Sequence, residues 1–127
     1  MNNTFATAIN CMDGRVQKCV HDYVSNKSDA EFVDAITLAG PSKVISEDKL
    51  KGVIADLKYR LDISINIHGS SYCVVAGHHD CAGVVEDDET HKEYIKQACM
   101  QVLTWYPNVM IEAIWVNDKF EVEVIKF

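Results

Sequence analysis

The sequence predicts an α/β domain in which a mostly parallel β-sheet is flanked by helices. Three apolar, strand-like stretches alternate with three amphipathic stretches of helical period, and two further strand-like stretches close the chain. This alternation is typical of parallel sheets, because a strand that returns in the same direction needs a helical crossover. We therefore expect strand order 2-1-3-4, with an antiparallel strand added at one edge of the sheet.

Five strands are expected from apolar, β-rich stretches that end at polar or turn-forming residues. These stretches cover residues 4–10, 31–38, 72–76, 109–116 and 119–126. The last two are joined at Asn117-Asp118, so they are expected to form a hairpin. The final stretch alternates apolar residues with glutamates, which favours an edge strand with one exposed face.

Three helices are expected from apolar residues that recur at helical spacing. Ser46 is expected to cap the second helix, because two acids follow it, and the Gly40-Pro41 pair before it is read as a break. Thr90 and Glu93 have the spacing of a capping box, so the third helix is expected to begin there and to stop before Pro107. The apolar stripes are Val16, Cys19, Val20, Tyr23 and Val24; Leu50, Val53, Ile54, Leu57 and Leu61; and Tyr94, Ile95, Ala98, Cys99, Val102 and Leu103.

Charge and hydropathy exclude several classes of protein. The chain has 127 residues, with 12 lysines and arginines against 19 acidic residues and a net charge of −7. An acidic balance disfavours binding to nucleic acid or to anionic lipid. No apolar run approaches the roughly 18 residues that span a bilayer, and no secretory signal pattern opens the chain. We expect a single domain over residues 1–127, located in the cytoplasm, with no nucleic-acid or membrane partner.

The five cysteines are odd in number and form no C-x-x-C pair. This pattern argues against a disulfide framework and fits a compartment in which thiols stay reduced. Three of the cysteines lie on apolar stripes or in strand interiors, and three of the histidines lie outside the strand ends. We expect core packing for Cys19, Cys73 and Cys99, and surface or loop positions for His21, His68 and His91.

Two unusual clusters follow the first and third expected strands. The first cluster is Cys11-Met12-Asp13-Gly14-Arg15, and the second is Gly77-His78-His79-Asp80-Cys81. In open α/β sheets, ligands bind beyond the carboxyl ends of the strands, where the strand order reverses. In a 2-1-3-4 sheet the first and third strands are neighbours at that point, so we expect the two clusters to meet.

The residue types in these clusters suit zinc. Thiolate sulfur and imidazole nitrogen are preferred zinc ligands, and His78 and Cys81 have a spacing that lets both bind one ion. Cys11 would supply a third ligand, which leaves a fourth position for water, as in a catalytic site. Asp13 is placed to accept a hydrogen bond at the metal, and Arg15 to hold that carboxylate through a bidentate pair.

Cys11-x-Asp13-x-Arg15 together with His78-x-x-Cys81 resembles the signature of the β-class carbonic anhydrases, and the chain is similar to a shortened, divergent member. The resemblance implies Cys11, His78 and Cys81 as ligands of Zn²⁺ and Asp13 and Arg15 as the catalytic pair. It also implies reversible hydration of carbon dioxide to bicarbonate by zinc-bound hydroxide, and a homodimer or higher even oligomer. Family members usually carry Arg-Asn-Ala-Gly after the second strand, whereas this chain keeps only the Ala-Gly pair before a proline.

Other functions remain open for the same residues. The site could hydrolyse carbonyl sulfide or carbon disulfide instead of hydrating CO₂, or the protein could bind zinc without turnover. Asp13 could also leave Arg15 and coordinate the metal in a closed form. A thiol phosphatase is disfavoured, because only three residues separate Cys11 from Arg15, too few for a loop that wraps a phosphate.

Overall fold

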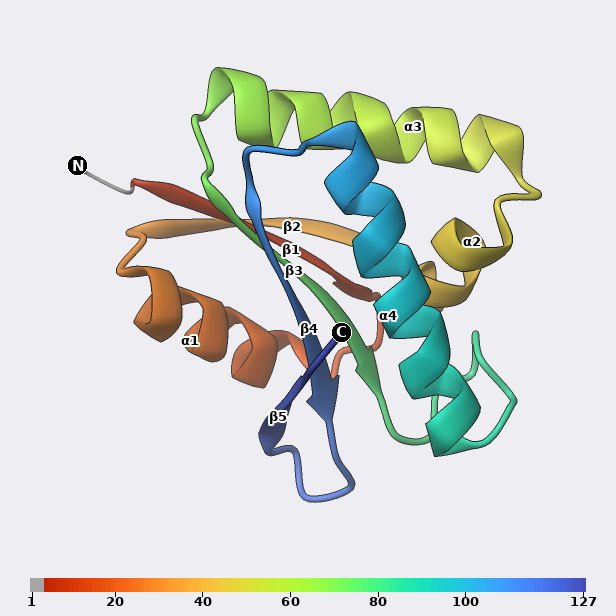
Figure 1. The fold of residues 1–127 in the computed structure, drawn as a ribbon. Helices are drawn as coiled ribbons and strands as arrows, with labels where there is room; N and C mark the ends of the chain where they lie inside the picture. Colours follow the sequence, from red (N-terminus) through yellow and green to blue (C-terminus); the bar gives the residue numbers. More distant parts are fainter. Residues whose placement is uncertain (1–3) are drawn as a thin grey trace.

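The computed structural model describes residues 4–127, which form a single sheet with helices on both faces (Figure 1). The strands are β1 (Phe5–Cys11), β2 (Phe32–Leu38), β3 (Tyr72–His78), β4 (Met110–Val116) and β5 (Val122–Ile125). The α-helices are α1 (Gln17–Ser28), α2 (Pro41–Glu47), α3 (Lys51–Asp62) and α4 (Asp88–Trp105), and a π-helical turn, η1 (Ile63–Ile67), extends α3.

The strand order is β2-β1-β3-β4-β5, which confirms the predicted order. The first four strands are parallel and β5 pairs antiparallel with β4. Ile9 of β1 lies opposite Val75 of β3, and each strand continues to a residue of the candidate site, Cys11 or His78. The two clusters are therefore carried to the same edge of the sheet by neighbouring strands.

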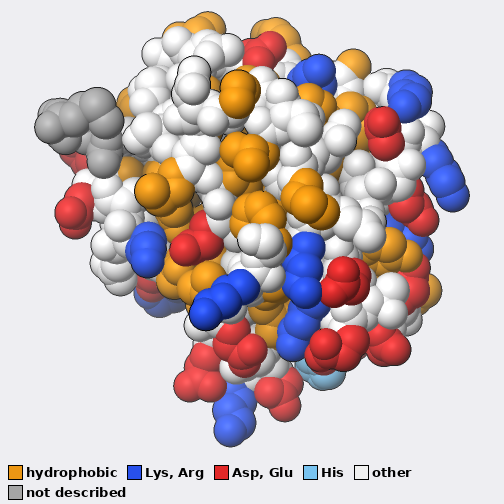
Figure 2. All heavy atoms as spheres, viewed as in Figure 1, with side chains coloured by type: hydrophobic (Ala, Val, Ile, Leu, Met, Phe, Trp, Pro, Cys, Tyr) orange, Lys and Arg blue, Asp and Glu red, His pale blue; other side chains and the backbone are white. Residues whose placement is uncertain are grey.

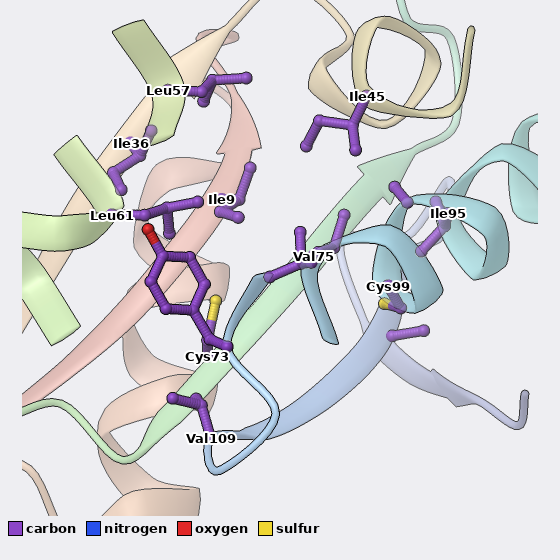
Figure 3. Close-up of a cluster of buried hydrophobic side chains, with 14 of the residues drawn as sticks. Ile9, Ile36, Ile45, Leu57, Leu61, Cys73, Val75, Ile95, Cys99 and Val109 are labelled. Atoms are coloured by element: carbon purple, nitrogen blue, oxygen red, sulfur yellow. The ribbon is translucent and has the colours of Figure 1, made fainter. Parts of the chain in front are cut away.

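Alternate residues of the central strands face different helices. Ile9 and Val75 belong to the cluster that packs under α2, α3 and α4 (Figure 3), whereas Ala8 and Val74 face α1. This alternation is the two-residue period of a strand buried on both faces. The expected core positions of Cys73 and Cys99 are confirmed. Cys19, in α1, is only half-buried and packs against the core between α1 and the sheet.

The segment between β2 and α3 differs from the sequence prediction. Gly40-Pro41 does not break the structure but begins α2, because proline needs no backbone N–H in the first turn of a helix. The expected start of a helix at Ser46 is wrong. Asp48 ends α2 in a left-handed conformation with φ of 52°, and α3 begins at Lys51 without a side-chain cap.

The last helix begins earlier than its apparent capping box. Asp87 is the N-cap, and its carboxylate accepts a hydrogen bond of 2.8 Å from the backbone N–H of Thr90. The prediction that Thr90 opens the helix is therefore wrong, because Thr90 is the donor in this cap. The final strand is also shorter than expected, since Phe120 has φ of 60° and lies in the turn.

The described helices do not include one long and apolar enough to cross a bilayer. On the face shown in Figure 2, acidic side chains gather at the lower end of the view, over the β4–β5 hairpin and the start of α4. This is the end of the molecule at which β1 and β3 finish.

Candidate metal centre

Cys11, His78 and Cys81 come together at the ends of β1 and β3. Their ligand atoms all lie within 4.8 Å of one another, and all three residues are buried. The two sulfur atoms are 3.8 Å apart. Two sulfurs at Zn–S distances of about 2.3 Å in a tetrahedral arrangement would lie about 3.8 Å apart, so this spacing fits zinc.

His78 is oriented by its neighbour. Its Nδ1–H donates a 2.8 Å hydrogen bond to the carbonyl oxygen of His79, which leaves Nε2 with a lone pair. This Nε2 is buried and has no hydrogen-bond partner within residues 4–127. A buried, unpaired nitrogen beside two thiols is the donor arrangement that a zinc ion would satisfy.

The environment of the two thiols favours one thiolate. The Cys81 thiol donates toward Cys11 and lowers the pKa of Cys11; burial opposes this shift, and His78 adds to it. Cys11 in turn raises the pKa of Cys81, as does burial. The backbone of Gly40 and that of Asp13 also lower the pKa of Cys11. Because the thiolate is the form that binds metals, a lowered pKa of Cys11 suits a metal ligand.

The loop after β2 approaches the loop after β3 closely enough to require glycine. Gly40 has φ of +61°, and a Cβ there would lie 2.9 Å from the backbone of Gly83. A Cβ on Gly83 would likewise lie 2.5 Å from the carbonyl carbon of Ala39. This close approach gives a physical reason for glycine at positions 40 and 83.

Arg15 holds the carboxylate of Asp13. Arg15 Nη2 donates to Asp13 Oδ2 at 2.7 Å, Nε donates to Oδ1 at 3.1 Å, and the Arg15 backbone N–H donates to Oδ1 at 2.9 Å. These bonds hold the pKa of Asp13 well below its usual range. Asp13 is thus paired with Arg15 and is not part of the Cys11-His78-Cys81 group.

Arg15 also reaches the loop between His78 and Cys81. Its Nη2 donates to the carbonyl oxygen of Asp80 at 3.1 Å, and Nη1 lies 3.4 Å from Asp80 Oδ2. Asp80 has φ of 59°, an uncommon conformation for a residue with a side chain. The guanidinium therefore joins the two loops across the site.

Gln17 supports the first loop from the start of α1. Its Nε2 donates 2.8 Å hydrogen bonds to the carbonyl oxygens of both Cys11 and Asp13. Buried Asn10 completes the network by donating to Gln17 Oε1 at 3.0 Å. Sequence reasoning missed both residues, because their role depends on where the backbone carbonyls of the loop point.

A cavity of about 510 Å³ opens beside His78 and Cys81. Its three carboxylates are each paired with another group of the protein. His79 Nδ1 lies 2.8 Å from Asp88 Oδ2, and this carboxylate raises the pKa of His79. The other pairs are Asp80 with Arg15, and Glu86 with Tyr94 and Lys43.

His91 also lines this cavity, which corrects the expectation that it lies at the surface. It lies on the inner side of α4, only 2% exposed, and its ring packs edge-on against Trp115 with centroids 5.1 Å apart. Burial lowers its pKa to about 4, with a further effect of His78. One signal was present in the sequence: His91 precedes Ile95, Ala98 and Val102 at the helical spacing of the inner stripe.

The profile of one protein family, described as "Putative carbonic anhydrase", matches residues 1–126. The chain belongs to this carbonic anhydrase family. The match covers nearly the whole chain and agrees with the resemblance seen in the two motifs. No curated protein matches the chain.

Solved carbonic anhydrases share the fold. The β-carbonic anhydrase isoform I of Trichomonas vaginalis has 14% sequence identity and a TM-score of 0.63, with 98% of this chain and 82% of that chain covered. The carbonic anhydrase of Glaciozyma antarctica has 14% identity, a TM-score of 0.58 and coverages of 98% and 83%. That of Streptococcus mutans has 16% identity, a TM-score of 0.59 and coverages of 98% and 82%. The present chain therefore has the fold of the β-class carbonic anhydrases in a shorter chain.

Proposed function

We propose that the protein is a zinc-dependent carbonic anhydrase that hydrates CO₂ reversibly to bicarbonate. The observation that carries the proposal is the buried Cys11-His78-Cys81 group, which lies beside a cavity and next to an arginine-held carboxylate, Asp13. Two thiols and one imidazole form the donor set expected of zinc rather than of a hard cation such as Mg²⁺.

Zinc held by three protein ligands would leave one position for water and lower the pKa of that water to about 7. The chain's own residues would then orient the reaction. Asp13 is kept ionised by Arg15, so its oxygens would accept a hydrogen bond from the reacting water and direct a lone pair toward the carbon of CO₂. Arg15 would keep Asp13 from turning, because it donates to both carboxylate oxygens.

Stopped-flow CO₂ hydration on protein of known zinc content tests this function. Hydration that rises with bound zinc, and that is lost in Cys81→Ser, is the expected result. One zinc per chain without hydration at any pH would contradict the proposal. The same protein would then be assayed with carbonyl sulfide and carbon disulfide, and inactivity with all three gases would identify a non-catalytic zinc protein.

We also propose that the protein is a homodimer or a higher even oligomer, as expected from the family resemblance. Light scattering would then give a mass of at least twice the 14.3 kDa of one chain. A mass equal to that of one chain at assay concentration, in active protein, would contradict this part of the proposal.

A further inference from the structure

The sulfur atoms of Cys11 and Cys81 are in contact, at a distance of 3.8 Å. The two residues approach from different elements, because Cys11 ends β1 and Cys81 lies in the loop between β3 and α4. The other cysteines are placed differently. Cys73 and Cys99 have no exposed area, and Cys19 is half-buried in α1. Cys11 and Cys81 are thus positioned for a reaction between their sulfurs.

A disulfide between the two residues requires only a modest movement. The S–S bond is about 2.05 Å long, so the sulfurs have to come about 1.8 Å closer together. Rotation of each side chain between staggered rotamers displaces its sulfur. Cys81 also lies outside the helices and strands, in a loop whose backbone can adjust. The contact that suits a zinc ion is therefore also one that an oxidant can close.

The cavity beside the site gives a small oxidant access to this pair. Cys81 lines the cavity, whose volume of about 510 Å³ is ample for a molecule the size of hydrogen peroxide. The carboxylates of Asp80, Glu86 and Asp88 line the same cavity and disfavour an anionic oxidant such as oxidised glutathione. A neutral hydroperoxide is therefore the class of oxidant that the cavity fits.

We propose that Cys11 and Cys81 form a reversible disulfide on reaction with a hydroperoxide, in competition with zinc. The inference rests on the proposed zinc site but not on the reaction that zinc supports there. The Cys81 sulfur attacks hydrogen peroxide, the O–O bond breaks, and Cys81 becomes a sulfenic acid while one water leaves. The Cys11 sulfur then attacks the Cys81 sulfur, the S–O bond breaks, and the hydroxyl leaves with the Cys11 proton as a second water. Two thiols are oxidised, and the peroxide is reduced to two waters.

The disulfide and the metal exclude each other. A zinc ion needs thiolate ligands, and neither sulfur of a disulfide supplies one. Bound zinc in turn engages the sulfur lone pairs that would attack the peroxide. A dithiol reductant would return both thiols by exchange and reopen the site to zinc. Peroxide and reductant together would thus set the fraction of protein able to hold the metal.

The test treats metal-free and zinc-loaded protein with hydrogen peroxide. In metal-free protein the titratable thiols should fall from five to three, with a mass loss of about 2 Da, two hydrogen atoms. Digestion without reductant, followed by mass spectrometry, should show the peptides of Cys11 and Cys81 joined. Oxidised protein should bind less than about a tenth of the zinc that reduced protein binds, and a dithiol should restore the rest. Bound zinc should slow the oxidation at least about tenfold.

The matched control is Cys19→Ser, which should form the same disulfide. Cys11→Ser should stop at a sulfenic acid on Cys81, which dimedone traps. Wild type unfolded in urea should give mixed pairings, and circular dichroism should show that the metal-free protein is folded. If a variant does not fold, the peptide map of wild type still decides. Five free thiols after oxidation, a disulfide between other cysteines, or a Cys11–Cys81 disulfide that leaves zinc binding unchanged would overturn the inference.

The two proposals fail separately. Absence of CO₂ hydration in zinc-loaded wild type contradicts the enzymatic function, yet the peptide map and the zinc content still decide whether the disulfide forms. Full hydration activity in a protein that peroxide does not cross-link would leave the function standing and remove the disulfide.

Discussion

The sulfur atoms of Cys11 and Cys81 lie 3.8 Å apart, although 70 positions separate the two residues in the chain. The contact is made where parallel strands β1 and β3 end side by side, and His78 joins it from the last position of β3. A metal bound there would tie together two loops that the sheet only brings near each other.

Removing a ligand is expected to remove both zinc and the stability that zinc adds. Cys81→Ser should bind far less than one zinc per chain, and its melting temperature should no longer fall when a chelator is added, because metal binding stabilises only the folded site. Elemental analysis and thermal unfolding measure both effects. The control is Cys19→Ser, which changes a half-buried residue of α1. This variant should keep its zinc and its response to the chelator.

Asp13→Asn is expected to keep zinc and to lose CO₂ hydration by roughly a hundredfold or more, because the amide cannot act as a charged acceptor. Stopped-flow kinetics at matched zinc content give the ratio. Lys18→Gln, a change of an exposed residue on α1, should leave the rate unchanged. An Asp13→Asn rate within a fewfold of wild type would exclude Asp13 from the reaction.

The pKa of Asp13 predicts a pH dependence of stability. Because the folded state lowers this pKa, the pairing with Arg15 stabilises the fold above the unfolded value of about 3.9 and is lost as the pH falls through the folded value. In metal-free protein, the melting temperature of wild type should exceed that of Asp13→Asn at pH 6, and the difference should shrink below about pH 4. A difference that is constant from pH 6 to pH 3 would contradict the pairing.

Two glycine substitutions should have opposite effects. Gly40→Ala should lower the free energy of unfolding by at least about 2 kcal/mol, since φ is positive and the new Cβ would meet the backbone of Gly83. Gly52→Ala, in α3 with open space around it, should raise that free energy by up to about 1 kcal/mol. Urea unfolding of both variants gives the comparison, and equal effects would refute the close approach of the two loops.

Gln17→Leu is expected to weaken zinc binding about tenfold without unfolding the protein, because the loop that carries Cys11 loses two hydrogen bonds from one side chain. Competition with a chromogenic zinc chelator measures the affinity. An affinity equal to that of wild type would show that the loop holds its shape without Gln17.

The meeting of Cys11, His78 and Cys81 was predictable because each lies at or just beyond the end of a recognisable strand. Apolar runs before Cys11 and His78 indicated that both lie at the carboxyl ends of parallel strands. Their thiol and imidazole groups, with the thiol of Cys81, indicated a zinc site. His91 was missed for a reason visible in the sequence, since its helical spacing with Ile95 was outweighed by its polarity.

Helix boundaries were less predictable than the site. Ser46 and Thr90 both have cap-like sequences, yet neither caps a helix in the structure. Ser46 instead lies inside α2 and hydrogen-bonds Gln97 of α4. Local capping preferences are worth only about 1 kcal/mol, so packing between helices decides where each one begins.

The sequence alone determined the α/β class, the strand order, the family signature and the three candidate ligands. These properties follow from hydrophobic period, turn residues and ligand chemistry, which are local along the chain. The tertiary structure alone decided three features. They are the hydrogen bonds of Gln17 to two carbonyl oxygens, the close contact of Gly40 with Gly83, and the position of His91 in the cavity wall. Each of these depends on how residues distant in sequence pack at short range, where a few tenths of an ångström determine whether atoms bond or collide.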